Sequence, residues 1–227
     1  MLSLNFNFKK FIIVCGHYGC GKTNFCINLA FDLSRLGKKV SIVDIDIVNP
    51  YFRASEYKDI LSAKNINIIS PAYALSTLDI PALSSEIYSI FSNDDDHVII
   101  DTGGDDAGVT ALGRFSSNII ESKNYTMLYL VNSYRALTKT TSEAVTIFHE
   151  IEAASKLKVT GIVNNSHLKA KTSAKDIINS CEFADNVAFE LNLPVIITTA
   201  PANIYNELVD KINNLYKVNI HVKSSWE

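Results

Sequence analysis

Several classes of protein are excluded by what this sequence lacks. Its four cysteines, at positions 15, 20, 26 and 181, form no Cys-x-x-Cys pair, so we expect neither a cysteine zinc site nor a disulfide framework. No apolar run approaches the roughly 18 residues of a membrane-spanning helix, and a formal net charge of −3 provides no broad cationic field for nucleic acid. We therefore expect a cytoplasmic protein without a strong nucleic-acid or membrane signal.

The 227 residues, 47% hydrophobic and 20% charged, suit a single α/β domain spanning 1–227. Short β-branched runs alternate with longer amphipathic segments, a pattern typical of βα units on a mostly parallel sheet between helices. The expected strands are 11–15, 40–44, 66–70, 97–101, 125–131, 159–164 and 195–199. The expected helices are 23–36, 138–156 and 173–191.

Two further segments are interpreted as irregular. Thr102 to Gly113 contains four glycines and two aspartates, a composition that predicts a mobile loop after a buried strand. Asn93 to Asp96 is most simply a solvated turn before the strand at 97–101, and we assign it no function.

The strongest motif is Gly16-His-Tyr-Gly-Cys-Gly-Lys-Thr23, which fits the pattern GxxxxGK[ST] between an expected strand and an expected helix. Its glycines allow backbone N–H groups to surround phosphate oxygens at the helix N-terminus. Lys22 would reach the β- and γ-phosphates, where it serves binding and catalysis. The motif predicts a three-layer P-loop NTPase fold, with nucleotide contacts from Gly16, His17, Tyr18, Gly19, Cys20, Gly21, Lys22, Thr23 and Asn24.

A magnesium site is predicted beside this loop. The Thr23 hydroxyl would supply one oxygen, since Mg²⁺ favours few protein oxygens together with phosphates and water. Asp101 ends the apolar run 97–101 and is our second metal residue, and Asp44 would support the same shell. Gly103 and Gly104 would sense the γ-phosphate. Asp105 and Asp106 order that loop, contact a partner or are simply solvated.

Asp44 and Asp46 lie two residues apart in extended chain, so their side chains point the same way. Asp46 would orient or deprotonate the attacking water, whereas the alternative is a pair of turn carboxylates. Arg53 either supplies charge in the transition state or forms a surface salt bridge.

Base recognition is expected from two places. The chain has no Asn-Lys-x-Asp sequence of the guanine-specific kind, which favours ATP. Asn164, at the end of an expected strand, either presents its amide to an adenine edge or is an ordinary turn asparagine. The segment from Thr199 to Ala202, including Pro201, would flank the base.

These motifs resemble those of the MinD/ParA/CobQ/CobB superfamily of P-loop proteins over essentially the whole chain. The resemblance rests on 16–23, on Asp46-Ile-Val-Asn-Pro-Tyr-Phe-Arg53 and on 101–114, and it is narrower for an uncharacterised bacterial branch. It implies a parallel sheet between helices, ATP with Mg²⁺, and a homodimer with nucleotides near its interface.

The chain departs from that pattern at His17 and Tyr18, where MinD and ParA relatives carry a signature lysine and a glycine. His17 either replaces the lysine in a pH-dependent way or is an ordinary loop histidine. Ile204, Leu208, Ile212 and Leu215 have helical spacing, but the segment contains acidic residues, so we expect it to dock on the core rather than on a membrane.

Three functions follow as hypotheses. The first is a slow Mg²⁺-dependent ATPase that binds ATP and ADP and acts as a switch for an unknown protein partner or assembly. The second is an ATP-dependent enzyme that activates a small carboxylate, as the relatives that make dethiobiotin or cobyrinate amides do. The third is a binding module with little turnover.

Overall fold

The structure is a computed structural model that describes residues 6–45, 57–70, 85–104 and 106–222. Eight parallel strands form one sheet in the order β3-β2-β4-β1-β5-β6-β7-β8. They are β1 (Phe11–Cys15), β2 (Val40–Asp44), β3 (Asn67–Ile69), β4 (His97–Asp101), β5 (Tyr125–Val131), β6 (Gly161–Asn164), β7 (Val195–Pro201) and β8 (Leu215–Val218).

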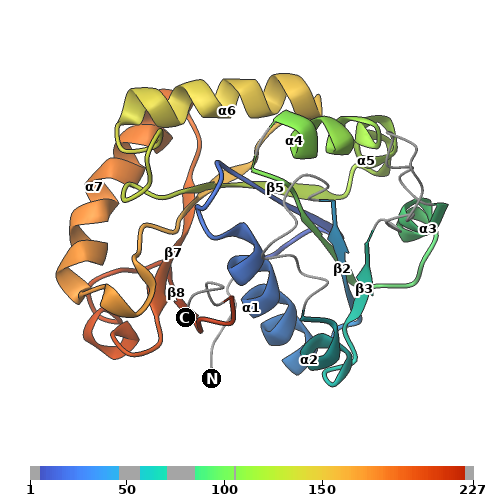
Figure 1. The fold of residues 1–227 in the computed structure, drawn as a ribbon, viewed down its shortest axis with the longest axis horizontal. Helices are drawn as coiled ribbons and strands as arrows, with labels where there is room; N and C mark the ends of the chain where they lie inside the picture. Colours follow the sequence, from blue (N-terminus) through green and yellow to red (C-terminus); the bar gives the residue numbers. More distant parts are fainter. Residues whose placement is uncertain (1–5, 46–56, 71–84, 105, 223–227) are drawn as a thin grey trace, which may run out of the picture.

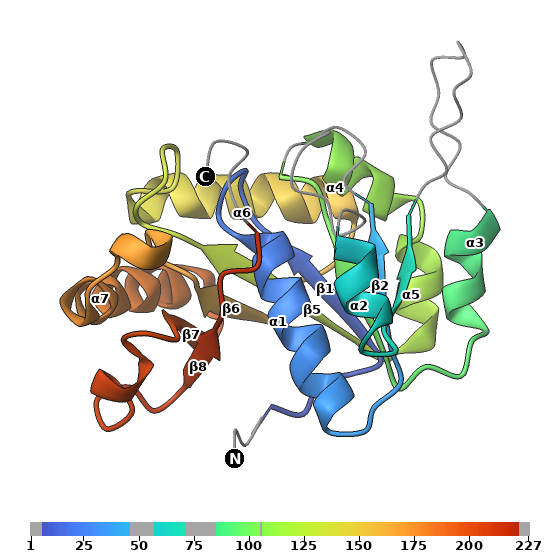
Figure 2. The same cartoon turned by 60° about the horizontal axis from the view of Figure 1, so that its bottom comes forward.

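Helices cover both faces of this sheet (Figures 1 and 2). The α-helices are α1 (Lys22–Arg35), α2 (Lys58–Ser62), α3 (Ser85–Tyr88), α4 (Asp106–Gly113), α5 (Ser116–Ser122), α6 (Thr141–Ser155) and α7 (Ala174–Leu191). Short 3-10 turns are η2 (Ser89–Phe91), η3 (Lys169–Lys171) and η4 (Tyr205–Glu207). The arrangement confirms the predicted three-layer α/β fold.

The central strand β1 shows why the sheet is buried on both sides. Phe11, Ile13 and Cys15 join the core under α4 to α7, while Ile12 and Val14 join the core under α1 and α2. Alternate side chains of a strand point to opposite faces, so a strand with helices on both sides reads as a continuous apolar run.

Two of the long helices begin at capping boxes. The Thr140 hydroxyl accepts from the Glu143 N–H at 3.2 Å, and the Glu143 carboxylate accepts from the Thr140 N–H at 3.0 Å. Ser173 and Asp176 repeat the arrangement before α7. Each box satisfies backbone donors that the first helical turn leaves without partners, so these caps define where α6 and α7 begin.

The prediction of a loop from Thr102 to Gly113 is wrong beyond residue 105, because α4 occupies Asp106–Gly113. Val109 and Leu112 bury their side chains in the core. A Cβ on Gly113 would lie 2.6 Å from the Ala154 carbonyl oxygen of α6. At Gly113, close packing of α4 against α6 therefore outweighs the weak helix propensity of glycine.

The helical interpretation of Ile204 to Leu215 is also wrong. This segment contains the 3-10 turn η4 and the start of β8, yet Ile204 and Leu208 are buried against Ile177 and Ala200. The expected docking on the core is thus confirmed without a helix. Among the described residues, no helix has the length and apolar character needed to cross a membrane.

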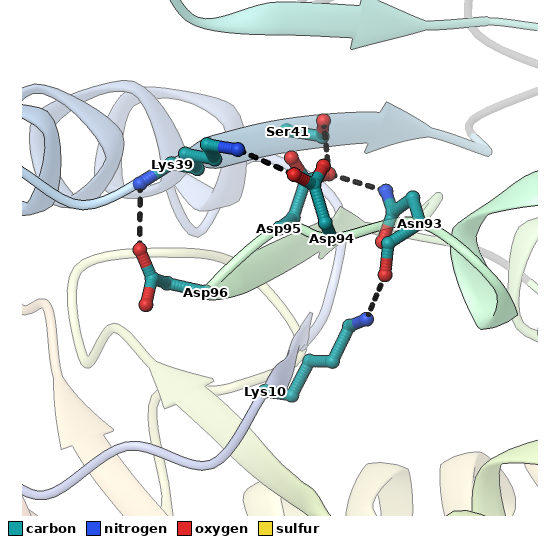
Figure 3. Close-up of polar contacts among 7 residues, drawn as sticks. All are labelled: Lys10, Lys39, Ser41, Asn93, Asp94, Asp95 and Asp96. Carbon is teal, nitrogen blue, oxygen red and sulfur yellow. Dashed lines mark hydrogen bonds and ion pairs between the residues drawn. The ribbon is translucent and has the colours of Figure 1, made fainter.

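The turn before β4 is a polar network rather than a freely solvated run (Figure 3). Asp95 accepts from the buried Ser41 hydroxyl at 2.6 Å and from the Asn93 amide. Asp94 pairs with Lys39, and the Lys10 ammonium donates to the Asn93 carbonyl at 2.8 Å. The network joins the amino ends of β1, β2 and β4, at the end of the sheet opposite the phosphate loop.

We expect Asp95→Ala to lower the free energy of unfolding by about 1–2 kcal/mol, because it leaves the buried Ser41 hydroxyl without its acceptor. Asp94→Ala is the matched control, since it removes only an exposed ion pair. Urea unfolding of both variants checks this. Equal midpoints for the two variants would contradict the structural role of Asp95.

Candidate nucleotide site

The phosphate loop lies between β1 and α1, as predicted, and its backbone is tightly enclosed. A Cβ on Gly16 would lie 2.5 Å from the Leu130 carbonyl oxygen of β5. Gly21 has a φ of 96°, and a Cβ there would lie 2.5 Å from the Asn165 amide nitrogen. Only glycine fits both positions, so close packing maintains the curved backbone that directs N–H groups toward an anion.

Lys22 is held inside this loop. Its side chain is buried, and the ammonium donates to the carbonyl oxygens of Gly16 at 3.1 Å and His17 at 3.3 Å. A buried charge needs such partners to offset its desolvation. The contacts place one positive charge at the centre of the curved backbone, where phosphate oxygens are expected.

The segment after β4 lies directly against the same loop. A Cβ on Gly104 would lie 2.5 Å from Tyr18 Cα and 2.9 Å from the Lys22 ammonium nitrogen. Any side chain at Gly104 would therefore displace the backbone of one loop or the other. The structure thus brings Gly104, Tyr18 and Lys22 together, and their contacts with a nucleotide remain predictions.

Asp44 and Asp101 end neighbouring strands in register and are both buried. Both carboxylates act on the Cys26 thiol of α1. Burial raises the pKa of this thiol most, followed by the charge of Asp101 and a hydrogen bond to it, and the charge of Asp44 has a smaller effect. Thr23 is the second residue of that helix. Two carboxylates and a hydroxyl are an oxygen set that fits Mg²⁺ when phosphates and water complete its shell.

Three residues to which the sequence analysis gave possible roles lie outside the described part of the chain. These are Asp46, Arg53 and Asp105. Their roles remain predictions. Among the described residues no cluster of three or more histidine, cysteine, aspartate or glutamate side chains could hold a metal ion by itself.

Asn165 is a site residue that the sequence interpretation missed. Its amide donates to the Cys20 carbonyl of the phosphate loop at 2.6 Å and accepts from the Thr199 hydroxyl of β7, also at 2.6 Å. It therefore ties the loop to the strand ends where a base is expected. The sequence shows two neighbouring asparagines, Asn164 and Asn165. Only the structure shows that Asn165 is the one that contacts the phosphate loop.

Asn164 has partners inside the protein. Its amide donates to the Ser180 hydroxyl of α7 at 2.9 Å, and its oxygen accepts from the Ser166 N–H at 3.2 Å. A base contact from Asn164 would require these bonds to be exchanged. Pro201 is the last residue of β7 rather than part of a loop, so that part of the prediction is corrected.

The Asn24 side chain binds the chain's own carboxyl-terminal segment. Its oxygen accepts from the His221 N–H at 2.8 Å and its amide donates to the Asn219 carbonyl at 3.0 Å. Asn28, one turn later, also bonds to Asn219. Because the Asn24 side chain is used in these contacts, its backbone N–H is the group that would bind a phosphate. The same contacts hold residues 219–222 along α1 (Figure 2).

His17 is half-buried, and both its burial and the charge of Lys22 lower its pKa below the ordinary value. The imidazole is therefore mostly neutral near pH 7. This argues against His17 as a source of the positive charge that the signature lysine supplies in the resembling proteins.

We expect Asn165→Ala to weaken nucleotide binding about tenfold or more, because the phosphate loop loses a buried hydrogen bond to its Cys20 carbonyl. Asn164→Ala is the comparison, and its loss of internal bonds should lower stability while affinity is kept. Calorimetric titration and thermal unfolding check both variants. If Asn164→Ala folds but loses more nucleotide affinity than Asn165→Ala does, the base contact would be assigned to Asn164 instead.

Solved structures of similar fold include the cell division protein FtsY of Thermotoga maritima, at 22% identity and a TM-score of 0.59 over 87% of this chain and 66% of that one. FtsY of Mycoplasma mycoides gives 16% identity and a TM-score of 0.59 over 85% and 62%. The signal recognition particle 54 kDa protein of Aeropyrum pernix, solved with GDP, gives 16% and 0.56 over 85% and 41%. This chain thus spans less than two thirds of their length, and the likeness shows the fold.

No curated protein sequence matched the chain. A family model, the CobQ/CobB/MinD/ParA nucleotide-binding domain, matches residues 11–214. The match covers every strand described from β1 to β7 and confirms the resemblance based on the phosphate loop. The chain belongs to the CobQ/CobB/MinD/ParA nucleotide-binding domain family.

Proposed function

We propose that this protein is a slow, Mg²⁺-dependent ATPase whose nucleotide state controls binding of a partner or assembly of a homodimer. The observation that supports it is the close approach of Gly104 to both Tyr18 and the Lys22 ammonium, which leaves no space for a side chain at Gly104. A γ-phosphate bound by Lys22 would meet the segment after β4 at once. Loops that bind a γ-phosphate in this way convert hydrolysis into a change of shape.

The metal role in this proposal rests on Thr23, Asp44 and Asp101. Mg²⁺ would neutralise charge on the β- and γ-phosphates. Asp101 is 1% exposed, and its position at the end of β4 links the metal site to the segment that contains Gly104. Asp46 is proposed to orient or deprotonate the attacking water.

One feature of the chain supports a preference for ATP over GTP. Leu168 is an exposed apolar residue three positions after Asn165, in the segment where a guanine-specific Asn-Lys-x-Asp sequence would carry its carboxylate. No carboxylate therefore stands there to accept from a guanine edge. We therefore expect the protein to bind ATP more tightly than GTP.

Calorimetric titration of ATP, ADP and GTP with Mg²⁺, together with phosphate release at several protein concentrations, tests the proposal. Turnover that rises steeply with protein concentration would support a nucleotide-dependent homodimer. Tight ATP binding with negligible release would favour a missing partner or a second, small carboxylate substrate. Failure to bind any nucleotide would refute the proposal.

Lys22→Ala is expected to abolish ATP binding, because it removes the ammonium that the loop carbonyls hold among the expected phosphate positions. Lys64→Ala, an exposed lysine near β3, is the charge-matched control and should bind as the unchanged protein does. Calorimetry at constant ionic strength makes the comparison. Near-normal affinity in a folded Lys22→Ala variant would contradict the assigned site.

Gly104→Ala is expected to weaken ATP binding much more than ADP binding, because its methyl group would push the segment after β4 away from Tyr18 and Lys22. The affinity for ADP in the same variant is the internal control. Equal losses for ATP and ADP would show that Gly104 shapes the loop as a whole and does not distinguish the third phosphate.

A further inference from the structure

The loops that follow β5 and β6 form one unit beside the phosphate loop. The Ser133 N–H donates to the Ser166 hydroxyl at 3.0 Å, and the Asn132 amide donates to the His167 carbonyl at 3.3 Å. Asn165, in the second of these loops, is bonded to Cys20 of the phosphate loop. Side chains on the two loops are therefore positioned relative to the phosphate loop and to each other.

Arg135, in the first loop, lies over Gly19 of the phosphate loop. A Cβ on Gly19 would lie 3.8 Å from Arg135 Nε and 3.9 Å from its Cδ. The Nε atom is buried and has no hydrogen-bond partner among the described residues. None of the ion pairs formed within the described part of the chain includes Arg135.

His167, in the second loop, is a second buried donor without an acceptor. The side chain is 7% exposed, and its Nδ1 accepts from the Lys169 N–H at 3.2 Å. The ring proton is therefore on Nε2, which is buried and has no partner within the described ranges. Burial, followed by the charges of Arg135 and Lys169, lowers the pKa of His167 to about 4, so the ring is a neutral donor near pH 7.

Charges of both signs act on the phosphate loop near these donors. Burial and, to a smaller extent, the charge of Asp101 raise the pKa of the Cys20 thiol, and the charges of Lys22 and Arg135 act against that rise. Buried donors normally have acceptors, and each exception calls for an explanation. Water can satisfy either donor, whereas an oxyanion also provides a counter-charge for the half-buried Arg135 guanidinium.

We propose that Arg135 and His167 form an oxyanion-binding subsite at the Gly19 edge of the phosphate loop, which binds a phosphate or carboxylate oxygen. Two sources provide that chemistry: the terminal phosphate of a bound nucleotide, and a separate small anion bound beside it. The first source rests on the proposed function, and the second does not. In either case Arg135 supplies from the same chain a positive charge that a neutral His17 lacks.

The test uses the full chain, Arg135→Gln, and Arg35→Gln as the matched control at the far end of α1, where the exposed guanidinium pairs with the largely buried Asp32. ATP and ADP are titrated by calorimetry with Mg²⁺. Inorganic phosphate and malonate are then titrated into the protein with and without saturating ADP. Thermal unfolding establishes that each variant is folded.

If the terminal phosphate is the occupant, Arg135→Gln raises the Kd of ATP about tenfold or more and leaves that of ADP unchanged, as expected for loss of a charge-assisted hydrogen bond. If a separate anion is the occupant, both nucleotide affinities stay the same and phosphate or malonate binding falls tenfold in Arg135→Gln. If neither changes relative to Arg35→Gln, the proposal is overturned.

Two outcomes separate this proposal from the preceding one. Arg135-dependent phosphate binding in a chain that binds no nucleotide would retain the subsite and refute the ATPase proposal. Should Arg135→Gln not fold, the ring ¹⁵N signal of His167 in the unchanged protein decides, with its assignment made from His167→Gln. A shift on addition of the anion supports the subsite, and an unmoved signal overturns it.

Discussion

The site depends on three glycines that have no space for a side chain. Gly16 lies against the Leu130 carbonyl, Gly21 against Asn165, and Gly104 against Tyr18, and each approach is too close for a Cβ. This packing joins the phosphate loop to β5, to the loop after β6 and to the segment after β4. Because interiors are close-packed, a displacement in one of these elements is transmitted to the others.

The charges of the site are arranged on the same framework. Lys22 is positioned by two loop carbonyls, and Asp44 and Asp101 are placed side by side by the register of β2 and β4. A parallel sheet collects the carboxyl ends of its strands at one edge. The basic residue in the loop and the acidic strand ends therefore lie at the same edge of the sheet, where the proposed nucleotide and metal would bind.

The carboxyl-terminal segment adds a constraint that the family pattern alone does not suggest. Asn24 and Asn28 hold residues 219–222 against α1, and the Tyr216 hydroxyl donates to Asp32 of the same helix at 2.8 Å. The helix that begins at the phosphate loop is thus anchored by β8 and the chain beyond it. Stability at the end of the chain is in this way coupled to the geometry of the phosphate loop.

Local sequence determined the phosphate loop, the central strands and the long helices, because glycine spacing, apolar runs and capping residues act over a few neighbouring residues. It did not determine α4, whose Gly113 packs against α6, nor β8, whose pairing with β7 follows from no local pattern. It likewise could not distinguish Asn164 from Asn165. Those features depend on which surfaces meet across the sheet, and only the tertiary structure decides such long-range packing.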